Sequence, residues 1–510
     1  MADDSKLQSS RSFSPGLAII FAVFSVIYIT LGYARSESGL VHAFDTGLYL
    51  QILKNLELGR GWASSVTNEP FFLAHHFQPI LAAIVPWHLV IPSSFGLLVL
   101  DLLAILITCF AIIKFAPRMG IASSSSASIA ALAFFFHPTI ASRVYYSFVP
   151  EVLSLPLLVV AALLLAKKDR LLAKEKIVLF VSLFAACLTK EPIWLTCAFT
   201  CALFAIKFRK TVDAKVFAFA SLLFGAAFVF IFFIWMPAHS TQTHYYALNY
   251  YKNDWVDGQW GMSGKILGAA LNVLSINSLT TFVTVAVLIP MGLLVFGNIW
   301  ATLGALPALG LILAASDGKV HALNNQHMIA ALPFLAVSTA VGLDRAKERL
   351  HNPKLQFYLA VFVCLVPLSI ASFTNTGLLF QAIFTQSHLE LDLRAKTDAI
   401  KKVLKTDDVI LTDGTLQPYF SEYPNVKVIL GFEGNPTKIT PEDLAQTTHV
   451  ITTNDLESLK DCRSLKAGEG DVQVFDYQGF YQFCEWLKQS HTEKVTLIPD
   501  RLIDIKILRN

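Results

Sequence analysis

Charged residues are scarce in this sequence of 510 residues: Asp, Glu, Lys and Arg make up 15% of it, and hydrophobic residues make up 54%. The mean hydropathy is +0.55. Soluble domains carry about 25% charged residues, so the composition excludes an ordinary soluble protein and indicates a membrane protein with many spans. The net charge of +3 is too small to indicate nucleic acid as a partner.

Several familiar signatures are also missing. The polar C-terminal part contains no glycine-rich dinucleotide pattern, no P-loop and no zinc-ligand spacing, and the chain has no repeat with a period of about 20–50 residues. Lys6 and Arg11 precede the first apolar segment, and no small-residue cleavage site follows it. We therefore expect a retained first helix and not a cleaved leader.

Cysteine gives little guidance. Of the seven cysteines, five lie inside apolar segments, where we expect them to act as small packing residues. Cys462 and Cys484 lie in the polar C-terminal part and could form a disulfide there if that part is extracytosolic.

A spanning helix needs about 20 mostly apolar residues, and apolar segments near this length recur along the chain, although several are shorter, notably the fifth and sixth. We predict about eleven spans, at 16–34, 95–115, 124–141, 152–166, 177–189, 192–207, 214–236, 279–297, 299–316, 328–343 and 355–374.

The apolar segment 79–92 is ambiguous, because it has about 14 residues and contains Pro86. The basic residues decide its placement. If 79–92 does not span, the basic connections all fall on the cytosolic side, as the positive-inside rule requires. They are Lys114 with Arg118 and the loops 167–176, 207–215 and 345–354.

This placement predicts a protein of the plasma (inner) membrane with a cytosolic N-terminal tail, 1–15, and a transmembrane domain, 16–384, whose first extracytosolic loop is 35–94. Helix and strand signals alternate after residue 384, with short β-like runs at 409–413, 426–430, 449–453 and 472–476. They predict a small α/β domain, 385–510, on the outer side.

Acids and histidines near the helix ends collect on that outer side. Apolar residues at helical spacing predict an interfacial helix over 46–58, and Asp45 precedes it. Asp45 is interpreted as the N-cap of this helix or as a general base at the membrane surface, and the two roles are compatible.

The other candidates each have a simpler structural interpretation. Glu151 begins a helix and could pair with Arg143, which could instead bind an anionic group. Lys190 and Glu191 sit between two spans, where charge is costly and often functional. Asp101, inside the second span, is expected to bond to a neighbouring helix, and a role at the substrate stays open. His75 and His76 are adjacent, so at most one is expected to face a site, and their spacing does not favour a metal pair.

The order of five short motifs resembles a family of uncharacterised bacterial multi-pass membrane proteins. The motifs are F-D-T-G-L-Y, H-H-F-Q-P, F-V-P-E, T-K-E-P and H-M-I-A-A-L-P-F-L. That family is similar in architecture to GT-C glycosyltransferases of the protein mannosyltransferase and aminoarabinose transferase type. The sequence departs from the family pattern at Leu50, Val149 and Pro192.

The resemblance implies an α-helical polytopic protein that transfers a sugar from a polyprenyl-phosphate donor at the extracytosolic face. It implies Asp45 as general base, Glu151 as a second catalytic residue, and substrate binding by His76, Arg143, Lys190, Glu191 and His327. The partners are then a lipid-linked sugar and the bilayer. The resemblance assigns no metal ligand, and it leaves open whether a divalent metal ion serves as a cofactor. The alternatives are a lipid or solute transporter, or a non-catalytic scaffold of envelope assembly.

Overall fold

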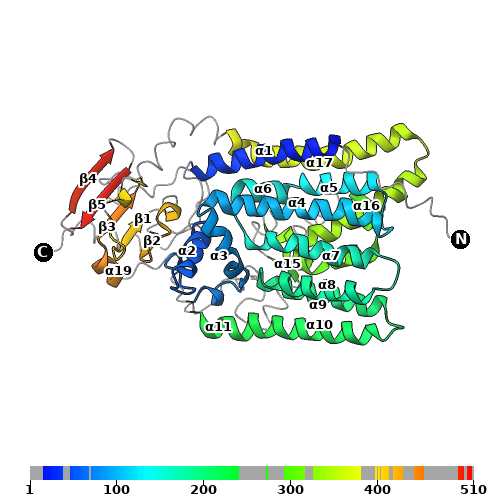
Figure 1. The fold of residues 1–510 in the computed structure, drawn as a ribbon, viewed down its shortest axis with the longest axis horizontal. Helices are drawn as coiled ribbons and strands as arrows, with labels where there is room; N and C mark the ends of the chain where they lie inside the picture. The colour runs from blue at the N-terminus through cyan, green and yellow to red at the C-terminus, as the bar shows by residue number, and fades with distance from the viewer. Residues whose placement is uncertain are drawn as a thin grey trace.

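The protein is described from a computed structural model. It describes residues 15–37, 46–67, 71–240, 271–273, 292–315, 326–380, 397–398, 400–402, 404–412, 417–428, 441–452, 492–498 and 502–507. The helices pack side by side into an elongated bundle, and a β-sheet lies beyond one end of it (Figure 1).

Within the described residues, four helical stretches are long and apolar enough to cross a membrane: Pro15–Tyr33, Ser94–Arg118, Asp213–His239 and Met328–Arg349. They belong to α1 (Pro15–Glu37), α4 (Ser94–Arg118), α10 (Asp213–Val229) with its continuation, and η9 with α16. The continuation of α10 is the π-helical η5 (Phe230–Trp235) and α11 (Met236–His239).

The remaining helices of the bundle are shorter or follow a break. They are α5 (Ser124–Phe135), α6 (Pro138–Tyr146), η4 (Pro150–Ser154), α7 (Leu155–Ala166), α8 (Ala173–Cys187), α9 (Glu191–Lys207), η8 (Gly292–Phe296), α14 (Ile299–Gly304), α15 (Leu306–Ala314), η9 (Gln326–Ala331), α16 (Leu332–Arg349) and α17 (Pro353–Phe380).

Two of the expected continuous spans are wrong, because each is broken near a proline. The segment 124–141 ends as α5 at Phe135 and restarts as α6 at Pro138, whose missing N–H and fixed φ suit the first turn of a helix. His137 caps α6, its Nδ1 accepting the Thr139 N–H at 3.2 Å. The segment 299–316 divides at Ala305 into α14 and α15. The span expected at 279–297 lies outside the described residues except for η8.

Two short helices of the first loop lie together at the sheet end of the bundle (Figure 1). They are α2 (Leu48–Glu57) and α3 (Ile80–Val90), with the 3₁₀ turn η3 (Phe72–Ala74) between them. α2 buries its apolar residues, as the spacing predicts, and α3 has 11 residues, about half of what a span needs. The N-cap role predicted for Asp45 lies outside the described residues; Thr46 and Gly47 precede α2, and Gly47 has helical dihedral angles.

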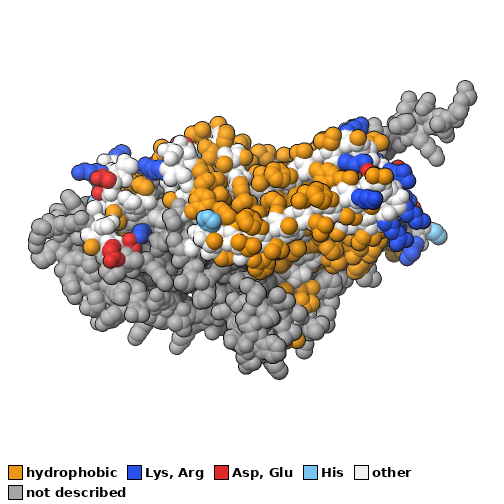
Figure 2. All heavy atoms as spheres, turned by 90° about the horizontal axis from the view of Figure 1, so that it is seen from below, with side chains coloured by type: hydrophobic (Ala, Val, Ile, Leu, Met, Phe, Trp, Pro, Cys, Tyr) orange, Lys and Arg blue, Asp and Glu red, His pale blue; other side chains and the backbone are white. Residues whose placement is uncertain are grey.

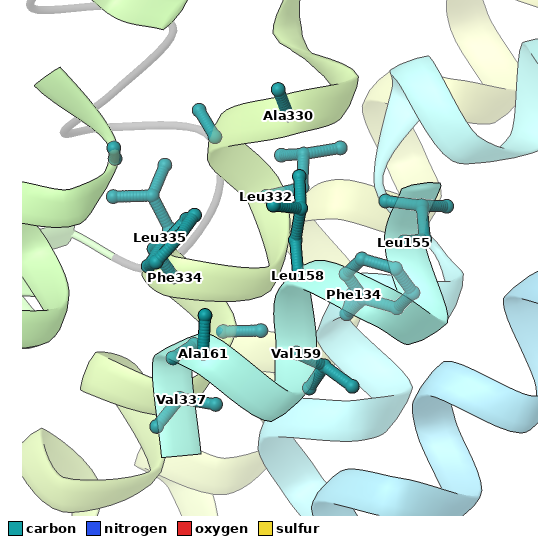
Figure 3. Packing of buried hydrophobic residues seen from close by; sticks show 14 of the residues in the cluster. Phe134, Leu155, Leu158, Val159, Ala161, Ala330, Leu332, Phe334, Leu335 and Val337 are labelled. Carbon is teal, nitrogen blue, oxygen red and sulfur yellow. The ribbon is translucent and has the colours of Figure 1, made fainter. Parts of the chain in front are cut away.

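The centre of the bundle is α7, which is apolar on every face and therefore surrounded by other helices. Its Leu158, Val159 and Ala161 pack against α5 and α16 (Figure 3). Small residues such as Ala161 let neighbouring helices approach closely, which is how helices gain packing energy in lipid. The cysteines predicted to pack in apolar helices do so: Cys109, Cys187, Cys197 and Cys201 are buried thiols, and Cys364 is partly buried.

Basic side chains gather at the end of the bundle opposite the sheet, and apolar side chains cover its middle (Figure 2). Contacts bring the basic connections together there. Lys176 Nζ bonds Asp213 Oδ1 at 2.6 Å, which joins α8 to α10. Lys207 Nζ donates to the carbonyls of Leu165 and Lys167, which joins the ends of α9 and α7.

The C-terminal residues form a five-stranded sheet in the order β2-β1-β3-β5-β4. Its strands are β1 (Ile410–Thr412), β2 (Val426–Val428), β3 (His449–Thr452), β4 (Thr492–Ile498) and β5 (Leu502–Ile507). Short helices η11 (Gln417–Phe420) and α19 (Pro441–Gln446) connect the parallel strands.

Three of the four strand predictions here are confirmed, as β1, β2 and β3. The run 472–476, Cys462 and Cys484 lie outside the described residues. The antiparallel hairpin of β4 and β5 was not predicted.

A close approach between α16 and η8 yields a test of the packing. A Cβ on Gly342 would overlap the carbonyl of Leu294, whereas a Cβ on Gly310 meets nothing within 4 Å. We expect Gly342→Ala to lower the free energy of unfolding by about 1–3 kcal/mol because the helices must separate. Gly310→Ala is the matched control and should leave it unchanged or slightly higher. Thermal unfolding in detergent measures both, and equal midpoints would contradict the close packing.

Candidate functional site

Lys190, the N-cap residue of α9, and Glu191, its first residue, join three parts of the chain at the sheet end of the bundle. Lys190 Nζ donates to Glu151 Oε1 of η4. Glu191 turns toward the first loop, where its Oε1 lies 3.2 Å from His76 Nδ1 and its Oε2 accepts the Phe77 N–H at 3.2 Å. The neighbouring residues therefore reach different elements, since successive side chains at a helix start point in different directions.

Both contacts are nearly closed to solvent. The side chains of Lys190 and Glu151 are 9% and 7% exposed, and that of Glu191 is 3% exposed. Removing such charges from water costs several kcal/mol per ion unless each has a partner of opposite charge and further hydrogen bonds. A further backbone bond, from Ile80 N to Leu188 O at 2.9 Å, ties α3 to the turn that precedes Lys190.

The two histidines of the first loop differ in role. His75 is buried, and this burial lowers its pKa well below the usual value, with a smaller effect of the same sign from His76. His75 is therefore neutral at physiological pH. His76 is partly exposed and contacts Glu191 of the charged cluster.

Asp101 is a buried acid that interacts with two charged residues of the predicted site. It is fully buried on α4, and its Oδ2 accepts the Val149 N–H at 3.4 Å. Arg143 on α6 and Glu151 are the charged groups that act on it electrostatically. Arg143 is itself buried, and its Nε donates to Ser142 Oγ at 3.3 Å. A bond to a neighbouring helix was expected of Asp101, and the bond found goes to the backbone of Val149, which precedes η4.

The structure thus brings five of the seven predicted site residues toward one end of the bundle: Glu151, His76, Arg143, Lys190 and Glu191. Asp45 lies outside the described residues, as does the side chain of His327. The ion pair of Glu151 is made with Lys190, a partner that the sequence did not indicate, because only tertiary packing brings the two residues together.

Two buried polar residues were not among the predicted site residues. Gln78 is fully buried, and within the described residues neither nitrogen nor oxygen of its amide has a hydrogen-bond partner. The same holds for Oδ1 of Asp101 and Oε2 of Glu151. Two features of the sequence could have indicated these residues. Asp101 is an acid inside an apolar span, and Gln78 belongs to the motif H-H-F-Q-P. Such groups are costly to bury without partners and are suited to accept or donate hydrogen bonds to a polar ligand.

A metal centre finds no support in the part of the chain that the structure describes, where no group of three or more His, Cys, Asp or Glu side chains comes together. The cluster can do three things chemically. It presents buried positive charge from Arg143 and Lys190, carboxylate oxygens as hydrogen-bond acceptors, and a rigid frame.

The chain belongs to the family described as "Predicted membrane protein (DUF2079)", which matches residues 37–486. It is therefore a membrane protein of an uncharacterised family, as the motif order predicts. No curated protein matches the sequence.

Solved structures of GT-C glycosyltransferases share the fold. ArnT from Cupriavidus metallidurans bound to undecaprenyl phosphate is similar with a TM-score of 0.53 at 12% identity, covering 97% of this chain and 98% of ArnT. The apo form of ArnT has a TM-score of 0.50 at the same identity. The arabinofuranosyltransferase AftD from Mycobacteria gives 0.50 at 16% identity over 98% of this chain and 42% of AftD. At such identities the likeness shows a GT-C-like fold and not an activity.

The buried ion pair makes a prediction about stability. Lys190→Met leaves Glu151 buried without its cation, so we expect it to lower the free energy of unfolding by about 3–5 kcal/mol. The double variant Lys190→Met/Glu151→Leu removes both charges and should recover most of that loss.

The surface pair of Lys176 and Asp213 is the control. Its side chains are 28% and 29% exposed, so Lys176→Met should change stability by about 1 kcal/mol or less. Chemical unfolding in detergent followed by tryptophan fluorescence measures all three variants. A double variant no more stable than Lys190→Met would contradict the pairing.

Proposed function

We propose that this protein is a membrane glycosyltransferase that moves a sugar from a polyprenyl-phosphate donor to an acceptor at the extracytosolic face. The observation that carries the proposal is the convergence of the buried ionic cluster with α2 and α3 at one end of a GT-C-like bundle. The bound undecaprenyl phosphate in the ArnT structure supports a lipid phosphate as the donor class.

The general base is Asp45, two residues before Gly47. It takes the proton of an acceptor hydroxyl while that oxygen attacks the anomeric carbon of the donor sugar. The bond between the anomeric carbon and the phosphate oxygen breaks, and its electron pair leaves with the polyprenyl phosphate. Attack from the face opposite the leaving group inverts the anomeric configuration. General-base assistance of this kind contributes about 10²–10⁴ in rate.

The buried cations stabilise the charge that grows on the departing phosphate. Arg143 and Lys190 sit in a frame that keeps them fixed and poorly hydrated, so no large reorganisation accompanies bond cleavage. Glu151 orients Lys190, and Glu191 orients His76. His327 is proposed to bind near the donor phosphate.

The orientation of the chain follows from its charge. The connections α7–α8, α9–α10 and α16–α17 carry the basic residues at the end away from the sheet, and positive residues stay on the cytosolic side. The multi-pass domain 16–384 then has a cytosolic N-terminus, and residues 385–510 form an extracytosolic α/β domain. α2 and α3 lie at the outer interface, at the depth of a lipid phosphate.

The assignment of the base is tested by Asp45→Asn. We expect this variant to insert and fold but to lose transfer by a factor of about 10²–10⁴, because the amide cannot accept the proton. Envelope glycans and lipid-linked sugars of a deletion strain are compared after complementation with wild type, with Asp45→Asn, or with Asp213→Asn as control at the opposite end. Restoration of glycans by Asp45→Asn would exclude this base.

The orientation is tested by single cysteines in a chain whose native cysteines are replaced. A membrane-impermeant thiol reagent should label Glu422→Cys in intact spheroplasts and Arg170→Cys only after permeabilisation, since the two lie at opposite ends of the bundle. The reverse pattern would overturn the topology.

A further inference from the structure

The C-terminal sheet packs directly on the first loop. Val428 of β2 belongs to one buried apolar cluster with Leu48 and Tyr49 of α2 and with Phe148, which precedes η4. The edges of this cluster include Trp62 and Leu153. Residues from the first loop, from the entry to η4 and from the C-terminal sheet therefore share a core, and such a core holds its members at fixed distances.

Polar contacts surround this core. Ser65 Oγ donates to the carbonyl of Val426 on β2. Ser65 is in turn held by Gln51 of α2, whose Oε1 accepts the Ser65 N–H at 3.1 Å. Arg60 Nη1 donates to the Glu422 carbonyl at 3.4 Å. The edge strand β2 thus has a partner in the loop after α2, which protects an edge that would otherwise be open.

The closest approach lies at the start of α2, where Gln417 of η11 meets Gly47. A Cβ on Gly47 would overlap Gln417 Oε1 and would lie 3.0 Å from Pro418 Cγ. Gly47 has helical dihedral angles, so the closeness of the Gln417 side chain constrains this position by space and not by backbone conformation. Gln417 is fully buried, and its amide atoms have no hydrogen-bond partner within the described residues. Burying such an amide costs about 1–3 kcal/mol, so its position has to be maintained by its surroundings.

This contact is linked to the ionic cluster. Thr46, next to Gly47, is buried, and its Oγ1 accepts the Phe148 N–H at 3.2 Å. Phe148 stands three positions before Glu151 in the chain. One short path therefore connects Gln417 with the first turn of α2 and then with the residue that pairs with Lys190.

We propose that Gln417 is a positioning residue through which the C-terminal sheet fixes the first turn of α2, and with it the loop that carries Asp45. This inference rests on the proposed function of Asp45. Gln417 touches no reacting atom; it acts by holding Gly47. The sheet is then part of the catalytic frame, and its loss lowers turnover without removing any charged residue of the cluster.

The first test is hydrogen exchange of α2 in the full-length protein, which requires no activity. Gly47→Ala introduces the overlap with Gln417, so amides of residues 46–50 should exchange at least about 10-fold faster, because the docked state loses stability. Gln417→Gly removes the side chain that contacts Gly47 and should also speed exchange of these amides, because the contact that positions the first turn of α2 is lost. The control is Gln446→Gly, which changes an exposed glutamine of α19 and should leave exchange of α2 unchanged. Unchanged exchange in Gln417→Gly would overturn the docking.

The second test is turnover with a polyprenyl-phosphate sugar donor. Gly47→Ala should lower kcat by about 10²-fold with KM for the donor changed little, because a displacement near 1 Å at the base affects the transition state more than binding. Gln417→Gly should lower kcat as well, because it removes the side chain that holds Gly47, and Gly310→Ala, with open space around its new methyl group, should have no effect.

The results separate the two proposals. Faster exchange in Gly47→Ala with unchanged kcat would overturn the positioning role and leave the proposed function intact. Activity retained in Asp45→Asn would remove the proposed function, whatever the exchange shows.

Discussion

Charge that is buried at one end of an apolar bundle must be paired, and the site depends on this constraint. Lys190 and Glu191 begin α9 with almost no access to water, so each needs a partner from another element. Glu151 and His76 supply these partners from η4 and the first loop. The requirement for pairing therefore fixes the relative positions of three segments that no regular secondary structure connects.

A frame held in this way suits a reaction in which negative charge develops on a leaving phosphate. Preorganised cations lower the energy of that charge more in a water-poor site than they would in water. The fold by itself does not specify this chemistry: at 12% identity to ArnT, the architecture is shared while nearly nine in ten aligned residues differ. The function therefore has to be inferred from the charged residues of the cluster and from Asp45. The C-terminal sheet packs on α2, which lies beside this cluster.

Much of the fold could be predicted from sequence. Hydropathy located α1, α4 and the α10 helix, and period-2 runs located β1, β2 and β3. Errors occurred where local chemistry overrides hydropathy. Pro138 divides α5 from α6, and Ala305 divides α14 from α15 ahead of Pro307. The hairpin of β4 and β5 was also not predicted.

The sequence by itself determined which residue types are costly in their segments. It selected Glu151, Arg143, Lys190 and Glu191, because a charged side chain beside lipid is costly and is often functional. It also predicted that the basic loops lie on one side of the membrane. Only the tertiary structure decided the partners. Lys190 meets Glu151, and Gln417 meets Gly47, through packing of elements that are distant along the chain. Hydrophobic periodicity records which face of a helix is buried, but it carries no information about which distant side chain will lie against it.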